Sequence, residues 1–209
     1  MSRSRKVEPE EAVNAAMALF WTHGFCSLGT RQIENETGIT RFTLQTTYGG
    51  KMELFLNALD AYLDTFENSG LLTSLDGDAE RIAVFFETRG NPKAMPDIAC
   101  QGCFMLNSMI EFSNKNAAVN QRTARYLDML RCGFGSALER SKMNTTLSPD
   151  FDVSAMADVL VSAALGLNAL IRASDDPNAG KAMAASIASM VRGWASKPSY
   201  EDINGCRNT

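Results

Sequence analysis

The sequence predicts an all-α protein, in which a short N-terminal three-helix unit precedes a longer helical region. Three observations lead to this class. Apolar residues recur at spacings of three and four along most of the 209 residues, as on one face of a helix. Glycine, proline and short polar clusters interrupt this pattern where helices of ordinary length end. No stretch shows the sustained apolar–polar alternation of a half-buried β-strand.

The first predicted helix follows a basic N-terminal arm, Arg3 to Lys6. Pro9 suits the first turn of a helix, and the acidic Glu10 and Glu11 suit the positive end of its dipole. Apolar residues then recur at helical spacing until Gly24, where the helix is expected to end.

The stretch TRQIENETGITRFTLQTTYGGK, residues 30–51, predicts two short helices around a tight turn. Gly38 suits the position just past the first helix, because glycine adopts a positive φ without a Cβ clash. Thr40 is a suitable N-cap for the second helix, which we expect to run as far as Tyr48.

Six further helices are expected after this stretch. The first begins at Lys51 and carries apolar residues at three- and four-residue spacing up to Phe66. Glycine, proline and Asx residues separate the others. These cover residues 79–89, 98–112, 119–141, 154–173 and 178–196.

The composition places the chain among folded proteins. Hydrophobic residues make up 45% of it, far more than in a disordered chain. The net charge of −4 and the isoelectric point of about 5.1 disfavour a protein that attracts nucleic acid with its whole surface. The N-terminus lacks the apolar core of a signal peptide, and no apolar run is judged long enough to span a bilayer. We therefore expect a cytoplasmic protein without a membrane partner.

Two short helices around a glycine-containing turn form a helix-turn-helix pattern, whose second helix enters the major groove of DNA. A helix ending in HGF, this stretch, and a long apolar helix together resemble the TetR family of transcriptional regulators over Pro9 to Phe66. The block GCFMLNSMIEF, from Gly102, is similar to the regulatory domain of a subgroup of that family. The resemblance implies a helix-turn-helix DNA-binding domain over residues 1–50, a helical ligand-binding and dimerisation domain over residues 51–197, and a polar tail over residues 198–209.

The resemblance implies a dimeric repressor that leaves a palindromic operator in double-stranded DNA upon a small-molecule signal. Arg41, at the start of the recognition helix, can pair with guanine or a phosphate. Phe42 and Thr43 can contact a thymine methyl, and Gln45 can read adenine. Threonine hydroxyl groups, the lysine ammonium group and the backbone N–H groups at the N-terminus of the first short helix can bind phosphate oxygens. The predicted DNA contacts are Thr30, Arg31, Thr40, Arg41, Phe42, Thr43, Gln45, Thr46, Thr47, Tyr48 and Lys51.

Two predicted contacts depart from the family's usual pattern. Gln45 stands where tyrosine is common, and Phe42 stands where glycine or another small residue is common. Because of Phe42, the operator sequences of relatives are a poor guide to the operator of this protein. The alternative for this stretch is a helical hairpin that binds no DNA and only buries Ile33, Ile39 and Leu44.

A recognition helix this short needs a second copy about 34 Å away to reach successive major grooves of one DNA face. The last two predicted helices suit a four-helix interface with twofold symmetry. The alternative is that their apolar faces only close the monomer core. The residues concerned are Ala155, Val159, Ala163, Gly166 and Leu170 on one helix and Met183, Ile187, Met190 and Trp194 on the other.

The resemblance further implies a pocket for a small-molecule effector among the middle helices. Methionine and aromatic side chains suit an apolar or aromatic ligand, but they can equally form the core. Arg89 can anchor an anionic ligand, or else form a surface or interdomain salt bridge. The predicted lining residues are Phe85, Phe86, Arg89, Cys103, Met105, Met109, Phe112, Tyr126, Met129 and Phe134.

Cys100 and Cys103 have the spacing of a redox pair or of half a zinc site. Since no second such pair exists and His23 is the single histidine, the sequence predicts no metal site, and we expect no cofactor. A helix N-terminus favours a thiolate, so Cys103 is the better candidate for sensing an oxidant or electrophile. Two buried, inert thiols are the alternative. The other cysteines are expected to be packing or surface residues: Cys26, Cys132 and Cys206.

Two other classes of function stay open at this point. A thiol oxidoreductase using the CxxC pair is disfavoured, because the chain lacks the βαβ pattern that such enzymes usually show. A helical interaction protein without DNA binding is the other alternative. We expect a regulator without enzymatic activity.

Overall fold

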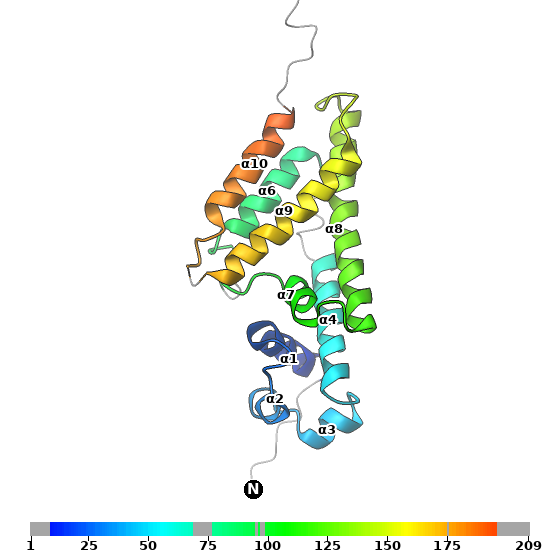
Figure 1. Cartoon of the computed structure of the whole chain (residues 1–209), viewed down its shortest axis with the longest axis vertical. Helices are drawn as coiled ribbons and strands as arrows, with labels where there is room; N and C mark the ends of the chain where they lie inside the picture. Colours follow the sequence, from blue (N-terminus) through cyan, green and yellow to red (C-terminus); the bar gives the residue numbers. More distant parts are fainter. Residues whose placement is uncertain (1–8, 69–76, 95, 97–98, 175, 196–209) are drawn as a thin grey trace, which may run out of the picture. The chain divides into compact units, whose positions relative to one another are not determined.

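The computed structural model describes residues 9–68, 77–94, 96, 99–174 and 176–195, and all regular structure within these ranges is α-helical (Figure 1). The predicted all-α class is therefore confirmed. The basic arm and the polar tail lie outside the described residues. The helices are α1 (Pro9–His23), α2 (Thr30–Thr37), α3 (Arg41–Thr46), α4 (Lys51–Asn68), α6 (Ala79–Gly90), α7 (Phe104–Phe112), α8 (Ala117–Met143), α9 (Val153–Ala173) and α10 (Lys181–Ala195).

The chain forms two compact units. The first contains residues 1–67 and 103–126, and the second contains residues 68–102 and 127–209. Helix α8 begins in the first unit and ends in the second. The domain boundaries at residues 50 and 197, which the sequence suggests, stay a prediction.

An aromatic core holds the first unit together. The rings of Phe20 in α1 and Phe55 in α4 meet edge to face, with centroids 5.0 Å apart. Phe55 meets Phe104 of α7 in the same way at 5.7 Å. All three side chains are almost fully buried, and each such burial stabilises the fold by about 1.5–3 kcal/mol. These contacts fix α1, α4 and α7 to one another.

The second unit is built around α6 and α10, which lie side by side (Figure 1). Gly90 permits their close approach, because a Cβ at this position would lie 2.4 Å from the Cβ of Ala184. On the outside of the pair, Arg192 of α10 bonds both Glu80 and Glu87 of α6, each at 2.6 Å. Hydrogen bonds from Arg192 hold the pKa of both carboxyl groups below the usual range.

Helix α9 corrects one expectation about membranes. Among the described residues it is long and apolar enough to cross a bilayer, whereas no such run was expected from the sequence. Its buried residues include Leu160, Leu167 and Ile171, which are part of the protein core. A buried core helix of a soluble protein meets the same length and composition test.

Two predicted helix starts are wrong. Helix α7 begins at Phe104 instead of residue 98, because Gly102 has a φ of +65° and Cys103 is extended, with φ −113° and ψ 127°. Helix α10 begins at Lys181 instead of residue 178, because Asn178 belongs to a turn that the N–H of Lys181 closes.

Candidate DNA-binding surface

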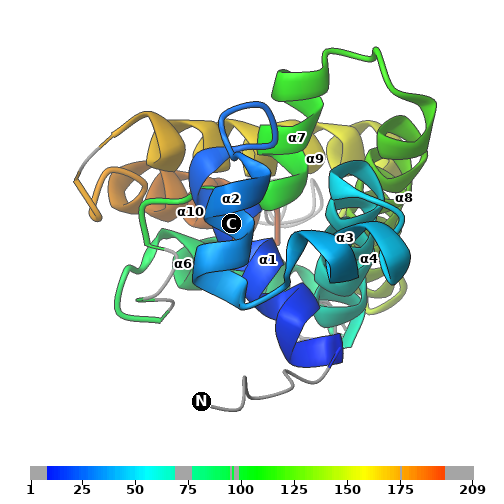
Figure 2. The ribbon, with the colours of Figure 1, turned by 90° about the horizontal axis from the view of Figure 1, so that it is seen from below.

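The predicted turn between α2 and α3 forms as expected (Figure 2). Gly38 ends α2 with a φ of +72°, and its N–H donates to the carbonyl oxygen of Glu34. Thr40 caps α3, because its hydroxyl oxygen accepts from the N–H of Thr43 at 3.1 Å. Both caps satisfy backbone groups that a helix end leaves without a helical partner. The roles that the sequence assigns to Gly38 and Thr40 are thus confirmed.

Helix α3 is shorter than predicted. It ends at Thr46 instead of Tyr48, because the N–H of Gly50 turns back to the carbonyl oxygen of Leu44 at 2.9 Å. Tyr48 is half-buried after the helix, with its hydroxyl 3.5 Å from the carbonyl oxygen of Pro9. Burial raises the pKa of Tyr48. Tyr48 therefore lies beyond α3, not on it.

Polar side chains and one large aromatic ring cover the outer face of α2 and α3. Phe42 is 76% exposed, and Thr43 is half-buried beside its cap. The hydroxyl of Thr46 donates to the carbonyl oxygen of Phe42, so binding a phosphate requires exchange of that hydrogen bond. The other predicted contacts on these helices and their caps are exposed: Thr30, Arg31, Thr40, Arg41, Gln45 and Thr47.

The inner face of the same helices is apolar. Ile33, Ile39 and Leu44 are at most 4% exposed, so their predicted burial is confirmed. This burial fixes which side of α3 faces outward, because residues at helical spacing share a face. The arrangement leaves Arg41 and Phe42 exposed at the start of a rigidly seated helix.

Lys51 begins α4 directly after the helix-turn-helix. Its ammonium nitrogen lies 4.3 Å from the centre of the Phe25 ring, a distance at which a cation is attracted to an aromatic face. Lys51, the predicted phosphate contact, is therefore held by an aromatic side chain of the α1–α2 turn. The sequence gives no sign of this contact, because residues 25 and 51 meet only in the folded unit.

Sequence reasoning also missed Glu111, in the last turn of α7. Its carboxylate accepts from the backbone N–H of Phe25 at 2.8 Å and from that of Cys26 at 2.7 Å. A hydrogen bond with this carboxylate, ahead of burial and charge, raises the pKa of the Cys26 thiol. Cys26 is exposed, so of the two roles expected for it, packing or surface, the structure gives the surface.

The predicted effector-binding residues fall into both units. In the second unit the rings of Phe85, Phe86 and Phe134 pack together, with centroids 5.3–5.8 Å apart. Arg89 is buried, with Nε donating to Asn168 and Nη2 to the carbonyl oxygen of Gly102. Both of these hydrogen bonds lie within its own unit, and Arg89 is not a surface group; its predicted roles in anchoring a ligand or in an interdomain salt bridge stay predictions. Met129 of α8 is half-buried.

The remaining predicted effector residues belong to the first unit. Cys103 is buried, and its sulfur lies 3.5 Å from the Tyr62 hydroxyl and 3.3 Å from the Tyr126 hydroxyl. Its CxxC neighbour Cys100, which belongs to the second unit, is half-buried in a turn that precedes α7. Met105 is buried, whereas Met109 and Phe112 are half-buried. A shared pocket for the residues of the two units stays a prediction.

Comparisons with known proteins agree with this geometry. A family model described as the C-terminal domain of tetracycline-repressor-like proteins matches residues 79–187. An uncharacterised helix-turn-helix regulator of Bacillus subtilis, YezE, is 27% identical over 180 residues, which are 84% of this chain and 92% of YezE. The helix-turn-helix repressor ComR of Escherichia coli is 24% identical over 161 residues, 76% of each chain.

A solved structure shares the fold over most of the chain. The TetR-family regulator CifR, determined as a cysteine mutant with a 26-base-pair operator DNA, superimposes with a TM-score of 0.75. It is 18% identical, and the match covers 92% of this chain and all of CifR. The fold and its helix-turn-helix thus define a DNA-binding transcriptional regulator.

The chain belongs to the TetR family, since the family model matches more than half of it. Proteins of this family are regulators of transcription without enzymatic activity. The oxidoreductase alternative is therefore ruled out.

Proposed function

We propose that this regulator is a cytoplasmic homodimeric repressor, which binds a palindromic operator through two copies of α3 and leaves it upon a small-molecule signal. The observation that carries the proposal is the two-sided character of α3. Its apolar side is buried, and its exposed side presents Arg41, Phe42 and Gln45. The name of the relative ComR as a repressor and the operator complex of CifR support the choice of DNA as partner and of repression as outcome.

The exposed side of α3 suits base and phosphate contacts in different ways. Arg41 can form two parallel hydrogen bonds to guanine or one charge-assisted bond to a phosphate. Phe42 has no polar atom in its side chain, so its exposed ring suits a thymine methyl group. Thr30 and Arg31 begin α2, whose N-terminus favours a phosphate.

Dimerisation through α9 and α10 is supported by apolar side chains that the folded chain leaves exposed. Val159, Leu170 and Met190 expose 43%, 42% and 39% of their surface. Burying them against a second copy stabilises the pair by removing apolar surface from water. Ala155 is exposed beside them, and Ala163 and Gly166 are half-buried.

The predicted dimer face is narrower on α10 than the sequence suggests. Ile187 is only 7% exposed and is part of the chain's own core. Met183 is half-buried, and its terminal methyl lies 3.3 Å from the position a Cβ would take at Gly166. Trp194 packs on Phe151, with ring centroids 5.4 Å apart. Met190 is therefore the α10 residue that we propose for the interface.

A DNA-binding assay tests the main proposal. Fluorescence anisotropy with the DNA upstream of the protein's own reading frame should give affinity that falls steeply with salt, because bound phosphates release counterions. We expect Arg41→Ala and Lys51→Ala to weaken binding without dissociating the dimer. Each lost phosphate contact should reduce the slope of log affinity against log salt by about 0.9.

Lys93→Ala is the matched control, since it removes one exposed positive charge from a loop of the second unit. Full affinity in both Arg41→Ala and Lys51→Ala would contradict the contact assignment. Sedimentation that shows only monomers of the wild type at the concentrations that bind DNA would contradict the dimer.

For the signal, we propose an apolar or aromatic effector bound among the middle helices. Such a ligand acts only by preferring the state that does not bind DNA. A shift from almost all bound to almost all free needs about 5.5 kcal/mol of preference. The candidate residues are those predicted from the sequence, with Cys103 as the candidate for an electrophile.

The environment of Cys103 supports the electrophile alternative. Cys103 is the N-cap residue of α7, its thiol donates to the Tyr126 hydroxyl at 3.3 Å, and the Tyr62 hydroxyl lies 3.5 Å from its sulfur. Alkylation by N-ethylmaleimide would add the S–H across a carbon–carbon double bond and enlarge a buried side chain. We expect this reagent to release DNA from the wild type but not from Cys103→Ser. Equal release from both proteins would exclude Cys103 from the mechanism.

A further inference from the structure

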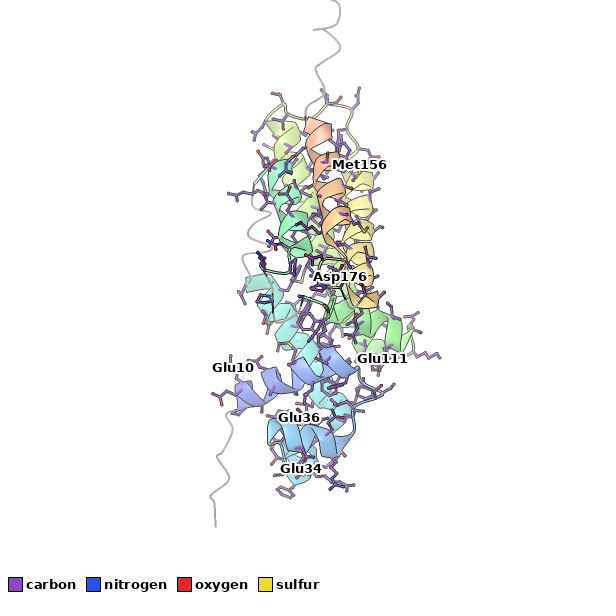
Figure 3. All side chains as sticks on the ribbon, turned by 90° about the vertical axis from the view of Figure 1, so that its left-hand side faces the viewer. Glu10, Glu34, Glu36, Glu111, Met156 and Asp176 are labelled. Atoms are coloured by element: carbon purple, nitrogen blue, oxygen red, sulfur yellow. The ribbon has the colours of Figure 1, made fainter. Side chains whose placement is uncertain are left out.

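Glu111 binds the backbone of the turn between α1 and α2. Figure 3 labels Glu111 on α7, and both of its carboxylate oxygens are engaged. Oε2 accepts from the N–H of Phe25 at 2.8 Å, and Oε1 accepts from the N–H of Cys26 at 2.7 Å. The two donors are consecutive, so the carboxylate holds the turn at two points and fixes its orientation.

The fit around this carboxylate is close. A Cβ at Gly24 would lie 3.2 Å from each of its oxygens, which is tighter than most real Cβ contacts. Phe112, the residue after Glu111, packs on Phe25 with ring centroids 5.3 Å apart. Contacts of α7 with the turn on both sides of the carboxylate therefore hold it in place, so it is not a freely moving surface group.

The turn that Glu111 holds carries the support for a DNA contact. The Phe25 ring lies beneath the Lys51 ammonium group at 4.3 Å and also packs on Phe55 at 5.1 Å. Lys51 is the first residue of α4 and directly follows the helix-turn-helix. Hydrogen bonds to the backbone of Phe25 thus position the ring, and the ring in turn positions the ammonium group.

We propose that Glu111 is a positioning residue for DNA binding, which couples α7 to the helix-turn-helix through the backbone of Phe25 and Cys26. The inference rests on the proposed function, because it assumes that Lys51 and α3 contact an operator. It adds a route for regulation, since α7 also carries the predicted effector residues Met105 and Met109. A signal that displaces α7 moves this carboxylate, and the α1–α2 turn moves with it.

A purely electrostatic role for Glu111 predicts the opposite result. A carboxylate near the DNA-binding helices repels phosphates, so its neutralisation alone would strengthen binding. The positioning role predicts weaker binding after the same change, because the turn loses its two charge-assisted hydrogen bonds. The sign of the effect therefore separates the two roles.

Three variants of the full chain test the inference. Glu111→Gln keeps the length of the side chain and removes the charge, whereas Glu111→Asp keeps the charge and shortens the reach by one methylene. Glu36→Gln removes an equal charge from the exposed surface of α2, where Figure 3 labels Glu36. The DNA probe is the labelled duplex that the wild type enriches most from a randomised pool.

We expect both Glu111 variants to bind this duplex about tenfold more weakly, a typical size for coupling between two sites. Glu36→Gln should bind as the wild type does, or slightly more tightly. In a second readout, hydrogen exchange at the amides of Phe25 and Cys26 should be slow in the wild type and about tenfold faster in both Glu111 variants.

Wild-type or tighter binding by Glu111→Gln would overturn the inference, as would fast exchange of both amides in the wild type. If Glu111→Gln unfolds at the assay temperature, the milder Glu111→Asp decides in the same way. Failure of the proposed function looks different, because the wild type itself would then enrich no sequence.

Discussion

Gly102 packs closely on α9 within the second unit, and its replacement by alanine tests that packing. Its φ of +65° is left-handed, and a Cβ there would lie 2.7 Å from the backbone oxygen of Asn168. The same Cβ would lie 2.9 Å from the Cβ of Arg172. Since both neighbours belong to α9, neither can rotate away without moving that helix. The carbonyl oxygen of Gly102 also accepts from buried Arg89 at 2.9 Å.

These contacts set the size of the expected effect. The left-handed backbone costs an alanine about 1–2 kcal/mol. Forcing an extra methyl into a packed site costs typically about 1–3 kcal/mol more. Gly102→Ala should therefore lower the free energy of unfolding by about 2–5 kcal/mol. At 2–4 °C per kcal/mol for a chain of this size, the Tm should fall by roughly 4–20 °C.

The matched control is Gly135→Ala in α8, where no described atom apart from the adjoining residues and the nearby backbone of α8 lies within 4 Å of the added Cβ. An alanine inside a helix should raise the free energy of unfolding by about 0.5–1 kcal/mol. Thermal unfolding followed by circular dichroism compares the variants at one fixed protein concentration, because association makes the Tm depend on concentration. A Gly102→Ala protein as stable as the wild type, or equal shifts in both variants, would refute the reasoning.

Two further predictions concern a helix cap and an ion-pair network. Thr40→Ala removes the acceptor of the Thr43 N–H and should destabilise α3 by about 1 kcal/mol, whereas Thr40→Asn should not. Thermal unfolding followed by circular dichroism checks this, because Thr40 is itself a predicted DNA contact and operator affinity would mix the two effects. Arg192→Gln should lower the Tm at neutral pH, because hydrogen bonds from Arg192 hold the pKa of Glu80 and Glu87 below their usual range. Carboxyl groups with a lowered pKa in the folded state stabilise the fold at any pH above their unfolded-state pKa. This stabilisation is lost as the pH falls through the folded-state pKa, so the Tm difference from the wild type should vanish in strong acid. A difference that persists there would contradict this assignment.

The helix-turn-helix was predictable because its determinants are local. Gly38 ends α2 through a bond to Glu34, and Thr40 caps α3 through a bond to Thr43. Each contact spans three or four residues, so the order of residue types is enough to predict it. Helix α3 ends earlier than the sequence predicts, because the backbone turns back at Gly50 although the polar sequence continues.

The start of α7 and the place of Ile187 could not be predicted in this way. Apolar residues occur at helical spacing before Phe104, so the pattern alone does not show where α7 begins, and the observed start follows the left-handed Gly102, which packs against α9. Ile187 was expected at a dimer face because its spacing matches Met183 and Met190. The apolar face of a helix is wide enough for one edge of it to pack on the core while the other edge stays exposed. The neighbouring helices therefore decide which of its residues are buried.

The sequence by itself determined the all-α class, the capped pair of short helices and the polar face of α3. It did so because helical periodicity and capping depend on residues within one or two turns of each other. The tertiary structure alone decided that Glu111 holds the turn at Phe25 and Cys26, 86 and 85 residues away along the chain. It likewise decided that two tyrosines face the thiol of Cys103. Such contacts depend on how whole helices pack, and that packing is a property of the assembled core, not of any short stretch of residues.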